Sequence, residues 1–257
     1  MNYAPRITII TPSFNQGDFI NDTIESVLSQ NYPNLEYLII DGGSTDCTSQ
    51  VVKKYEKYVT WISEPDKGQA DAINKGIKRA SGDIIAFINS DDYYLSDVFY
   101  RVVNIFSSNP KIGWITGDYV IINAKNELIQ SFVARYKKFY RNRSSPHTLR
   151  LTNYIVQPST FWGKRINQEI GLFDISLQYA FDYDFWLRLI DKYPFECINE
   201  PLSAFRIHDQ SKGGTEFQKQ FKEEISVLKR YEHSKFEYLF HIVHNWLIVH
   251  TYDIIRK

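Results

Sequence analysis

Two adjacent carboxylates stand where an apolar run of the chain stops. The run 84–88 is followed by Asn89 and Ser90, and then by Asp91 and Asp92. Like charges side by side repel each other and resist dehydration, so a buried strand does not tolerate them unless something neutralises them. Two explanations are open at this point: a solvated turn, or a hard divalent cation held by carboxylate oxygens at the tip of the strand.

Polar or acidic residues also follow three earlier apolar runs. These segments are 11–15 (TPSFN), 41–44 (DGGS) and 64–67 (EPDK). Each has an ordinary structural explanation on its own, because Asp-Gly-Gly forms turns and Ser44 or Thr45 can cap a helix. Four such segments on one edge of a sheet would instead favour an acidic cleft large enough for a nucleotide.

The elements that must position these segments alternate between strand and helix from residue 7 to about residue 120. Strands separated by helices form right-handed βαβ crossovers in a mainly parallel sheet, and ligands bind beyond the carboxyl ends of such strands. All four polar segments fall at those ends. The predicted strands are 7–11, 35–40, 59–62 and 84–88, and the predicted helices are 19–30, 45–58, 70–80 and 98–106.

The composition is that of a globular protein without an overall charge. The chain has 257 residues, 43% hydrophobic and 16% aromatic, enough for one large α/β domain or two small ones. Thirty basic residues balance thirty acidic ones, so no overall field favours nucleic acid. Cys47 and Cys197 lack a metal-binding spacing and suit reduced thiols in the cytosol. With neither a signal peptide nor a run of about 20 apolar residues, we expect a soluble protein or one at a membrane surface.

Two segments of the second half carry further chemistry. Residues 135–143 hold five cations and three aromatic rings without an acid, which fits either phosphate binding or a solvated basic surface. Asp182 opens a helical pattern, where a carboxylate either stabilises the helix dipole or acts as a base. Residues 217–257 are expected to be helical and aromatic-rich, packed on the core, on a second subunit in a homodimer or on a membrane surface.

In this order, the segments resemble glycosyltransferase family 2, the inverting nucleotide-sugar transferases with a GT-A fold. The resemblance runs from about residue 7 to residue 208, and its order and spacing make it specific. It implies a Rossmann-like, mainly parallel α/β sheet flanked by helices, with a nucleotide-binding half at 1–120, an acceptor half at 121–212 and a C-terminal helical extension at 213–257. The pieces that carry it are ITIITPSFNQ, LIIDGGSTDCTSQ, EPDKGQADAINKGIKRASGDIIAFINSDD and FDYDFWLRL.

The resemblance implies a site for a nucleotide sugar, expected to be uridine-linked. The loop at 11–15 would line the nucleoside pocket, Asp41 would accept a hydrogen bond from the base, and Asp66 and Asp71 would lie along the ribose and diphosphate. Arg206 and Lys212 are lesser candidates for the diphosphate. The full set implied for the donor is Thr11, Pro12, Phe14, Asn15, Asp41, Asp66, Asp71, Asp91, Arg206 and Lys212.

Asp91 and Asp92 resemble the DxD element of the family, which holds Mg²⁺ or Mn²⁺ against the diphosphate. A hard cation neutralises both carboxylates and stabilises charge on the departing diphosphate, which favours the metal over the solvated turn. Asn89 stands where many members have another acid, and this leaves open which of the two aspartates binds the metal directly. His208 matches a late histidine that lies near the metal or diphosphate in many members.

Asp182 aligns with the catalytic base of the family. The glutamate that usually precedes the base is replaced by Phe181, and a less polar site is expected to raise the pKa of Asp182 toward a useful value. The base would take the proton from an acceptor hydroxyl as its oxygen attacks the anomeric carbon opposite the leaving diphosphate, which inverts the configuration. Asp184 is the next candidate for this role.

Two other classes of protein compete with this interpretation. A nucleotidyltransferase would be expected to have a glycine-rich basic loop after the first strand, and TPSFNQGDF has no cation. A non-catalytic nucleotide- or glycan-binding module would not need Asp182. We therefore expect a cytoplasmic enzyme, or one peripheral at the inner membrane surface, that acts on a polysaccharide or lipid-linked glycan.

Overall fold

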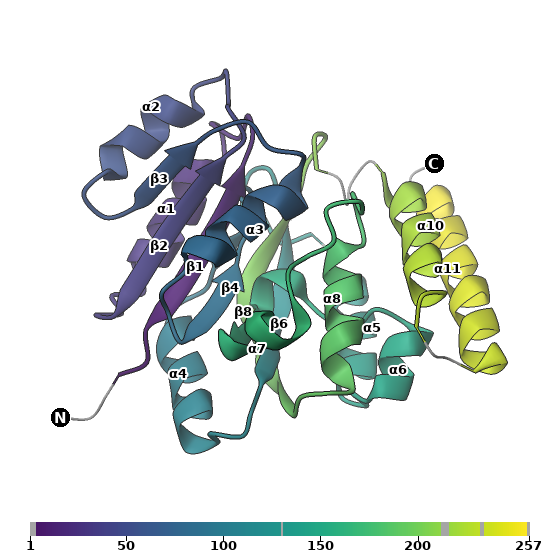
Figure 1. The fold of residues 1–257 in the computed structure, drawn as a ribbon. Coiled ribbons are helices and arrows are strands. Elements are labelled where there is room, and N and C mark those ends of the chain that lie inside the picture. Colours follow the sequence, from purple (N-terminus) through teal and green to yellow (C-terminus); the bar gives the residue numbers. More distant parts are fainter. Residues whose placement is uncertain (1–3, 130, 212–215, 232–233, 256–257) are drawn as a thin grey trace.

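The frame of the protein is a mixed sheet in which the strand order is β3-β2-β1-β4-β7-β6-β8-β5. The computed structural model describes residues 4–129, 131–211, 216–231 and 234–255. Helices cover both faces of the sheet, as Figure 1 shows. The strands are β1 (Ile7–Ser13), β2 (Leu35–Asp41), β3 (Thr60–Ser63), β4 (Ile84–Phe87), β5 (Tyr93–Tyr94), β6 (Trp114–Asn123), β7 (Thr160–Gly163) and β8 (Phe195–Ile207).

The first four predicted strands are confirmed as a parallel set. β1 pairs with β2 and with β4, and β2 pairs with β3, each in parallel. β1 and β4 are buried along their whole length, as expected of parallel strands with helices on both faces. In the register of this set Ser13 lies opposite Asp41, and Asp41 lies opposite Ser63, so the carboxyl ends of β1, β2 and β3 meet at one edge.

The predicted helices of the first half are also present, with one shorter than expected. The pattern at 45–58 contains a short helix followed by a 3-10 turn, η1 (Lys53–Tyr55); a second 3-10 turn, η2 (Gln157–Ser159), precedes β7. The helices are α1 (Ile20–Leu28), α2 (Thr48–Val52), α3 (Gln69–Arg79), α4 (Val98–Ser108), α5 (Ser131–Arg141), α6 (Pro146–Leu151), α7 (Arg165–Ile170), α8 (Phe181–Ile190), α10 (Phe217–Leu228) and α11 (Lys235–Ile255).

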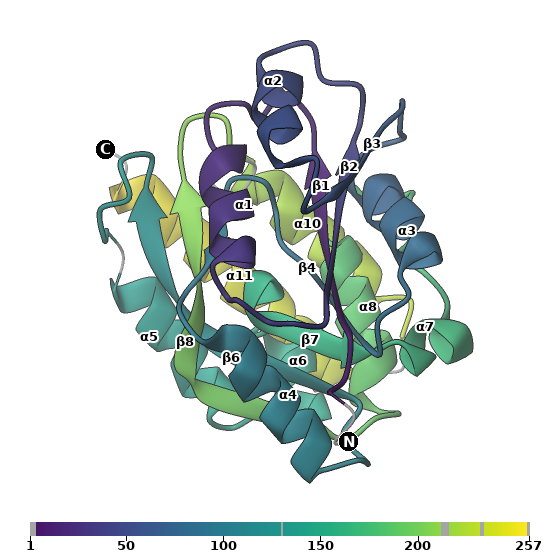
Figure 2. The same cartoon turned by 90° about the vertical axis from the view of Figure 1, so that its left-hand side faces the viewer.

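Two hydrophobic clusters, one on each face, hold the helices to the sheet. Alternate residues of a strand point to opposite faces, so Ile9 joins one cluster and Ile10 the other. The Ile9 cluster receives α1 and α4, and the Ile10 cluster receives α3 and α8. Figure 2 shows α1 and α4 in front of the sheet and α10 and α11 behind it.

The second half continues the same sheet. β7 runs antiparallel to β4 and to β6, whereas β8 runs parallel to β6. The expected division at residue 120 falls inside β6, so the two halves share this strand. The sheet is therefore parallel through the first half and mixed beyond it.

The C-terminal segment forms two helices rather than one, and they pack on the core. Val227 and Leu228 of α10 are fully buried in the cluster that contains Ile10, and α11 contacts α6 and α10. Figure 1 shows α10 and α11 side by side next to α8. Within the described ranges, none of the helices combines the length and apolar character needed to cross a bilayer.

Candidate active site

Phe14 and Asp66 flank the open end of the β1–β2 edge. The Phe14 side chain is 60% exposed just beyond β1, and Asp66 follows β3. A Cβ added to Gly42 would lie 2.5 Å from Asp66 Oδ2 and 3.3 Å from Phe14 Cδ2, so only glycine permits this close approach. The arrangement leaves an exposed aromatic face beside a carboxylate, two features that suit a planar base and a ribose.

The Asp41 carboxylate is hydrogen-bonded by neighbouring residues of the protein. Its side chain is 1% exposed, and Oδ2 accepts hydrogen bonds from Ser63 Oγ at 2.6 Å and from the Ser44 N–H at 3.0 Å. Ser44 Oγ also donates to Oδ1. The carboxylate thus ties the ends of β2 and β3 together, and the expected hydrogen bond to a base stays a prediction.

The remaining residues of the first loop divide into buried and exposed members. Thr11 and Pro12 are buried in β1, and the Thr11 hydroxyl lies 3.1 Å from Tyr37 Oη. Asn15 is exposed with φ +52°, and its Oδ1 accepts a hydrogen bond from the Thr45 N–H at 2.9 Å. Asn15 therefore holds the exposed loops after β1 and β2 together, whereas Thr11 makes its contact within the buried part of the sheet.

The Asp71 carboxylate lies at the start of α3. Its Oδ2 accepts a hydrogen bond from the Lys67 N–H at 3.1 Å and lies 3.9 Å from Lys75 Nζ. A carboxylate in the first turn satisfies free N–H groups and favours the helix dipole. Its expected contact with the ribose or diphosphate stays a prediction. Lys212 lies outside the described residues.

The structure separates the environments of the two adjacent carboxylates. Asp92 is fully buried, with Oδ1 accepting from the Arg206 N–H at 2.9 Å and Oδ2 from the Asn89 amide at 3.2 Å. Burial, and then the charge of Asp91, raise the pKa of Asp92 well above its ordinary value. Asp91 is partly open, and its Oδ2 lies 3.1 Å from Nε2 of His208.

Arg206 is directed into the protein. Its side chain is 1% exposed, and its guanidinium donates to the Asp91 carbonyl at 2.7 Å, to Asn126 Oδ1 at 2.6 Å and to Asp22 Oδ2 at 2.9 Å. The structure does not bring this group to the open edge. Arg206 instead braces the turn that carries Asp91 and Asp92.

The side chains that could coordinate a metal ion suit a hard cation whose other ligands are diphosphate oxygens. The Asp91 carboxylate and the His208 imidazole converge, and Mg²⁺ typically uses one or two protein ligands together with phosphate oxygens. Among the described residues no group of three or more His, Cys, Asp or Glu side chains is arranged to hold a metal. The protein therefore offers two converging ligands and not a closed metal cage.

A cavity of about 510 Å³ extends from this edge to α8 and to the C-terminal helices. Asn89 and Gln157 line it, and the Asn89 amide reaches both Asp92 Oδ2 and, at 3.3 Å, Gln157 Oε1. Asp182 lines the same cavity. The expected base therefore shares this space with Asn89, which begins the turn that carries Asp91 and Asp92.

The environment of Asp182 suits a base that works near neutral pH. Burial raises the pKa of its carboxyl to about 6, while the Tyr183 N–H, which donates to Oδ1 at 2.7 Å, and the charge of Lys137 counter part of that rise. The residue before Asp182 is the buried, apolar Phe181, so no acid lies beside the carboxyl of Asp182 at that position. The expected rise in the pKa of Asp182 agrees with this environment.

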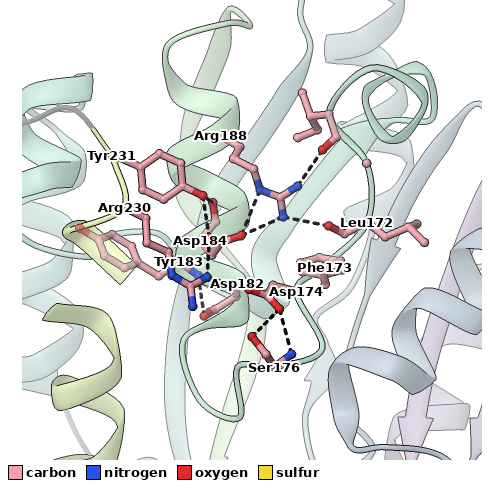
Figure 3. Close-up of polar contacts among 12 residues, drawn as sticks. Leu172, Phe173, Asp174, Ser176, Asp182, Tyr183, Asp184, Arg188, Arg230 and Tyr231 are labelled. Carbon is pink, nitrogen blue, oxygen red and sulfur yellow. Dashed lines mark hydrogen bonds and ion pairs between the residues drawn. The ribbon is translucent and has the colours of Figure 1, made fainter. Parts of the chain in front are cut away.

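Asp184 has a structural role in the same helix. Its carboxylate is 6% exposed, accepts from Arg188 Nε at 3.0 Å and receives the Tyr231 hydroxyl at 2.6 Å. Arg188 also donates to the carbonyls of Ile170 and Leu172, and these bonds attach α8 to the preceding segment while Asp184 holds the guanidinium in place (Figure 3). A carboxylate with this many partners is not free to accept a substrate proton.

The basic segment 135–143 is only partly a surface feature. Arg141 is fully buried and lies 2.7 Å from Asp118 Oδ1, and Lys138 lies 3.2 Å from Asp118 Oδ2. Lys137 faces the cavity beside Asp182. Asp118 lies outside the basic segment in the sequence, so the acid that pairs with these cations could not be found from the segment itself. Arg135 and Arg143 remain exposed.

Comparison with known proteins identifies the family. The sequence model described as Glycosyl transferase family 2 matches residues 8–166. The chain belongs to glycosyl transferase family 2. The resemblance found in the sequence motifs is confirmed, and the match covers the carboxyl ends of β1, β2 and β3 and the turn that carries Asp91 and Asp92, but ends before Asp182 and His208.

Relatives and solved structures extend this family 2 assignment. The chain is 42% identical over 101 residues to the putative teichuronic acid biosynthesis glycosyltransferase TuaG of Bacillus subtilis, which covers 37% of this chain and 40% of TuaG. Relatives matched over most of this chain are longer, and the chain spans 65% of the length of two of them.

Two solved structures share the fold at low identity. The mannosyltransferase PcManGT from Pyrobaculum calidifontis, in complex with GDP-Man and Mn²⁺, superposes with a TM-score of 0.72 at 17% identity, over 96% of this chain and 70% of that one. TarS 1–349 of S. aureus, in complex with UDP-GlcNAc, gives 0.67 at 16% identity, over 87% and 65%. The expected GT-A architecture is confirmed.

Sequence reasoning missed several residues that line the cavity. Gln69 donates to Asn89 Oδ1 at 2.6 Å, and Gln157 anchors to the Phe87 carbonyl at 2.8 Å, so both fix the turn before Asp91. Lys137 and Glu224 face the same space from α5 and α10. Glu224 stands among the charged residues of a helical pattern, so no local signal in the sequence distinguishes it.

Proposed function

We propose that the protein is a metal-dependent inverting glycosyltransferase. It would move a sugar from a nucleotide donor, UDP-linked in our proposal, to a hydroxyl of a polysaccharide or lipid-linked glycan. The observation that carries the proposal is one cavity lined both by Asn89, the first residue of the turn that carries Asp91 and Asp92, and by Asp182. Family membership supports the same activity.

Donor binding is assigned to the carboxyl edge of the sheet. Phe14 would stack on the base and Asp66 would receive ribose hydroxyls, since these two side chains flank the close approach at Gly42. Asp91 and His208 would hold Mg²⁺ or Mn²⁺, which stabilises negative charge on the diphosphate when bound. We assign the direct carboxylate ligand to Asp91 because Asp92 is buried and engaged on both oxygens.

Asp182 is assigned the proton transfer. The acceptor oxygen would form a bond to the anomeric carbon while its proton passes to an Asp182 oxygen, and the bond from that carbon to the diphosphate oxygen would break with its electron pair on the diphosphate. One displacement from the face opposite the leaving group inverts the anomeric configuration. Raising the pKa of the base toward neutrality favours such transfer.

The acceptor side is apolar as well as polar. Tyr119, Phe181 and Phe205 line the cavity, and Leu247 links it to exposed apolar side chains of α11. This combination supports an acceptor that has an apolar portion, such as a lipid-linked glycan, presented at a membrane surface. TuaG is named as a putative glycosyltransferase of teichuronic acid biosynthesis, which is compatible with a glycan acceptor.

A transfer assay with a panel of nucleotide sugars tests the proposal. The purified chain is screened by thermal shift with Mn²⁺, and the stabilising donors are then tested for turnover with and without acceptor. Release of nucleoside diphosphate that needs Asp182 supports a glycosyltransferase. Stabilisation without release would favour a binding module, and release of pyrophosphate from a nucleoside triphosphate would favour a nucleotidyltransferase.

A further inference from the structure

The C-terminal helices contribute a second carboxyl to the cavity of the expected base. Glu224 of α10 is 2% exposed and lines the same space as Asp182 of α8. Lys137 of α5 faces that space as well, and its Nζ donates to the Ile155 carbonyl at 3.3 Å. Two acids and one cation from three separate helices therefore line one cavity, and the cation can neutralise only one of the two carboxylates.

The neighbours of Glu224 distinguish its two oxygens. Oε1 accepts a hydrogen bond from the Gln220 amide at 3.2 Å, and the Asn153 amide also donates to the carboxyl group. Oε2 lies 4.0 Å from Nε2 of His241, whose side chain is fully buried. That distance is longer than a hydrogen bond, but His241 Nε2 has no hydrogen-bond partner.

The tautomer of His241 indicates whether Glu224 Oε2 carries a proton. His241 Nδ1 lies 3.1 Å from the carbonyl oxygen of Arg150, and a carbonyl can only accept, so Nδ1 carries the hydrogen. Burial lowers the pKa of His241 to about 4, so the ring is neutral and Nε2 is a bare acceptor. An ionised Glu224 would leave two buried acceptors facing each other, whereas a carboxylic acid supplies the missing donor.

We infer that Glu224 is a carboxylic acid, with its proton on the oxygen that faces His241, while Asp182 is ionised. Glu224 is then a positioning residue: a neutral Glu224 adds no negative charge beside Asp182, so the charge of Lys137 favours the ionised form of Asp182 that a base requires. The catalytic meaning of this arrangement rests on the proposed function, whereas the protonation state of Glu224 does not.

The directions of the pKa shifts agree with this assignment. Burial, and then the charge of Asp182, raise the pKa of Glu224 to about 7. Burial also raises the pKa of Asp182, and the charge of Lys137 counters part of that rise. The titratable or charged groups around the pair and Lys137 are Tyr136, Lys137 and Arg141 from α5, Tyr179 before α8, Tyr183 from α8, Glu223 from α10, and His241 and His244 from α11.

Infrared spectroscopy of the free protein tests the protonation state without any substrate. With glutamate side chains carrying ¹³C, the wild type should show a carboxylic-acid carbonyl band near pH 6, below the pKa of about 7 of Glu224 and above that of an ordinary glutamate. Glu224→Gln should lack that band, and Glu56→Gln, which alters an exposed glutamate, should retain it. No acid band in the wild type, or a band that survives in Glu224→Gln, would overturn the inference.

A second measurement remains informative if Glu224→Gln does not fold. The ¹⁵N chemical shifts of His241 in the wild type should report a neutral ring with hydrogen on Nδ1 only. A doubly protonated ring at the same pH would mean an imidazolium paired with an ionised Glu224. That result would overturn the inference.

The pH profile of kcat/KM tests the positioning role. Lys137→Met should move the acid limb to higher pH, because Asp182 loses the charge that favours its ionised form. In Glu224→Gln the midpoint of the acid limb should stay close to that of the wild type, whatever the height of the profile. A shift of about one unit to lower pH in Glu224→Gln would show that Glu224 is ionised and would overturn the inference. Absence of transfer in the wild type would reject the proposed function and leave the infrared result unaffected.

Discussion

Asp91 Oδ2 and His208 Nε2 lie 3.1 Å apart, although 117 positions separate the two residues in the sequence. The pair closes because β8, which precedes His208, runs beside β5, which follows Asp91 and Asp92. Phe19 packs on the His208 ring, with centroids 4.3 Å apart, and fixes its orientation. The sheet thus brings together a carboxylate and an imidazole at the edge where the donor is expected.

Binding of uridine diphosphate should require a divalent cation and the Asp91 carboxylate. Asp91→Asn should weaken Mn²⁺-dependent binding by at least about tenfold, because a direct ligand is lost and the fold keeps its polar contacts. Isothermal titration calorimetry in Mn²⁺ and in EDTA measures the effect. Equal affinity of the wild type in the two buffers would remove the metal from the proposal.

Asp182→Asn should lower turnover and leave donor affinity intact. A positioned general base contributes about 10²–10⁴-fold, so kcat should fall by that order while the dissociation constant of the donor stays near the wild-type value. Steady-state kinetics and donor titration separate the two quantities. Transfer near the wild-type rate would place the base elsewhere.

The pH dependence of the reaction follows from the same carboxyl. The base acts only when ionised, and burial raises its pKa to about 6, so kcat/KM should be lost as pH falls through about 6. If the carboxyl had its ordinary pKa of about 4, kcat/KM would not fall until a much lower pH. A profile without an acid limb near pH 6 would contradict this assignment.

Asp184→Asn should destabilise the protein and is not expected to mimic Asp182→Asn. Arg188 would lose its buried partner, which costs about 3 kcal/mol of unfolding free energy. Glu200→Gln is the matched control, since it breaks the exposed pair with Arg101 and should cost less than about 1 kcal/mol. Urea unfolding measures both variants, and equal losses would contradict the assigned structural role.

The exposed apolar side chains of α11 should support binding to anionic vesicles. They are Phe236, Leu239, Val243, Trp246 and Leu247. Exposed Arg135 and Arg143 add electrostatic attraction of about 1 kcal/mol each near the surface, so the wild type should pellet with vesicles and be released by salt.

A double variant distinguishes the surface from its control. Phe236→Ser with Trp246→Ser should remain in solution, whereas Tyr58→Ser, which removes an aromatic ring that is 68% exposed on another part of the protein, should pellet as the wild type does. Equal sedimentation of all three proteins would argue against a membrane role for α11. A concentration-dependent change in oligomeric state in the double variant would instead indicate a subunit interface.

The sequence by itself determined the parallel half of the fold and the polar residues at its carboxyl edge. Local periodicity and strand-end chemistry are short-range properties, so β1 to β4, the segment TPSFNQ and the pair Asp91–Asp92 were predictable from order and spacing. The same short-range signals placed Asp182 at a helix start. They did not separate its role from that of Asp184, because the two carboxylates have similar neighbours along the chain.

Only the tertiary structure decided which polar groups remain available. Arg206 was a candidate for the diphosphate until the fold placed it against Asp22 and Asn126, and the basic segment gained its acid from distant Asp118. Burial and pairing depend on contacts between residues far apart in sequence, which no local pattern encodes. For the same reason the cavity of Asp182 could receive Glu224 from α10, a helix whose own sequence indicates nothing beyond packing.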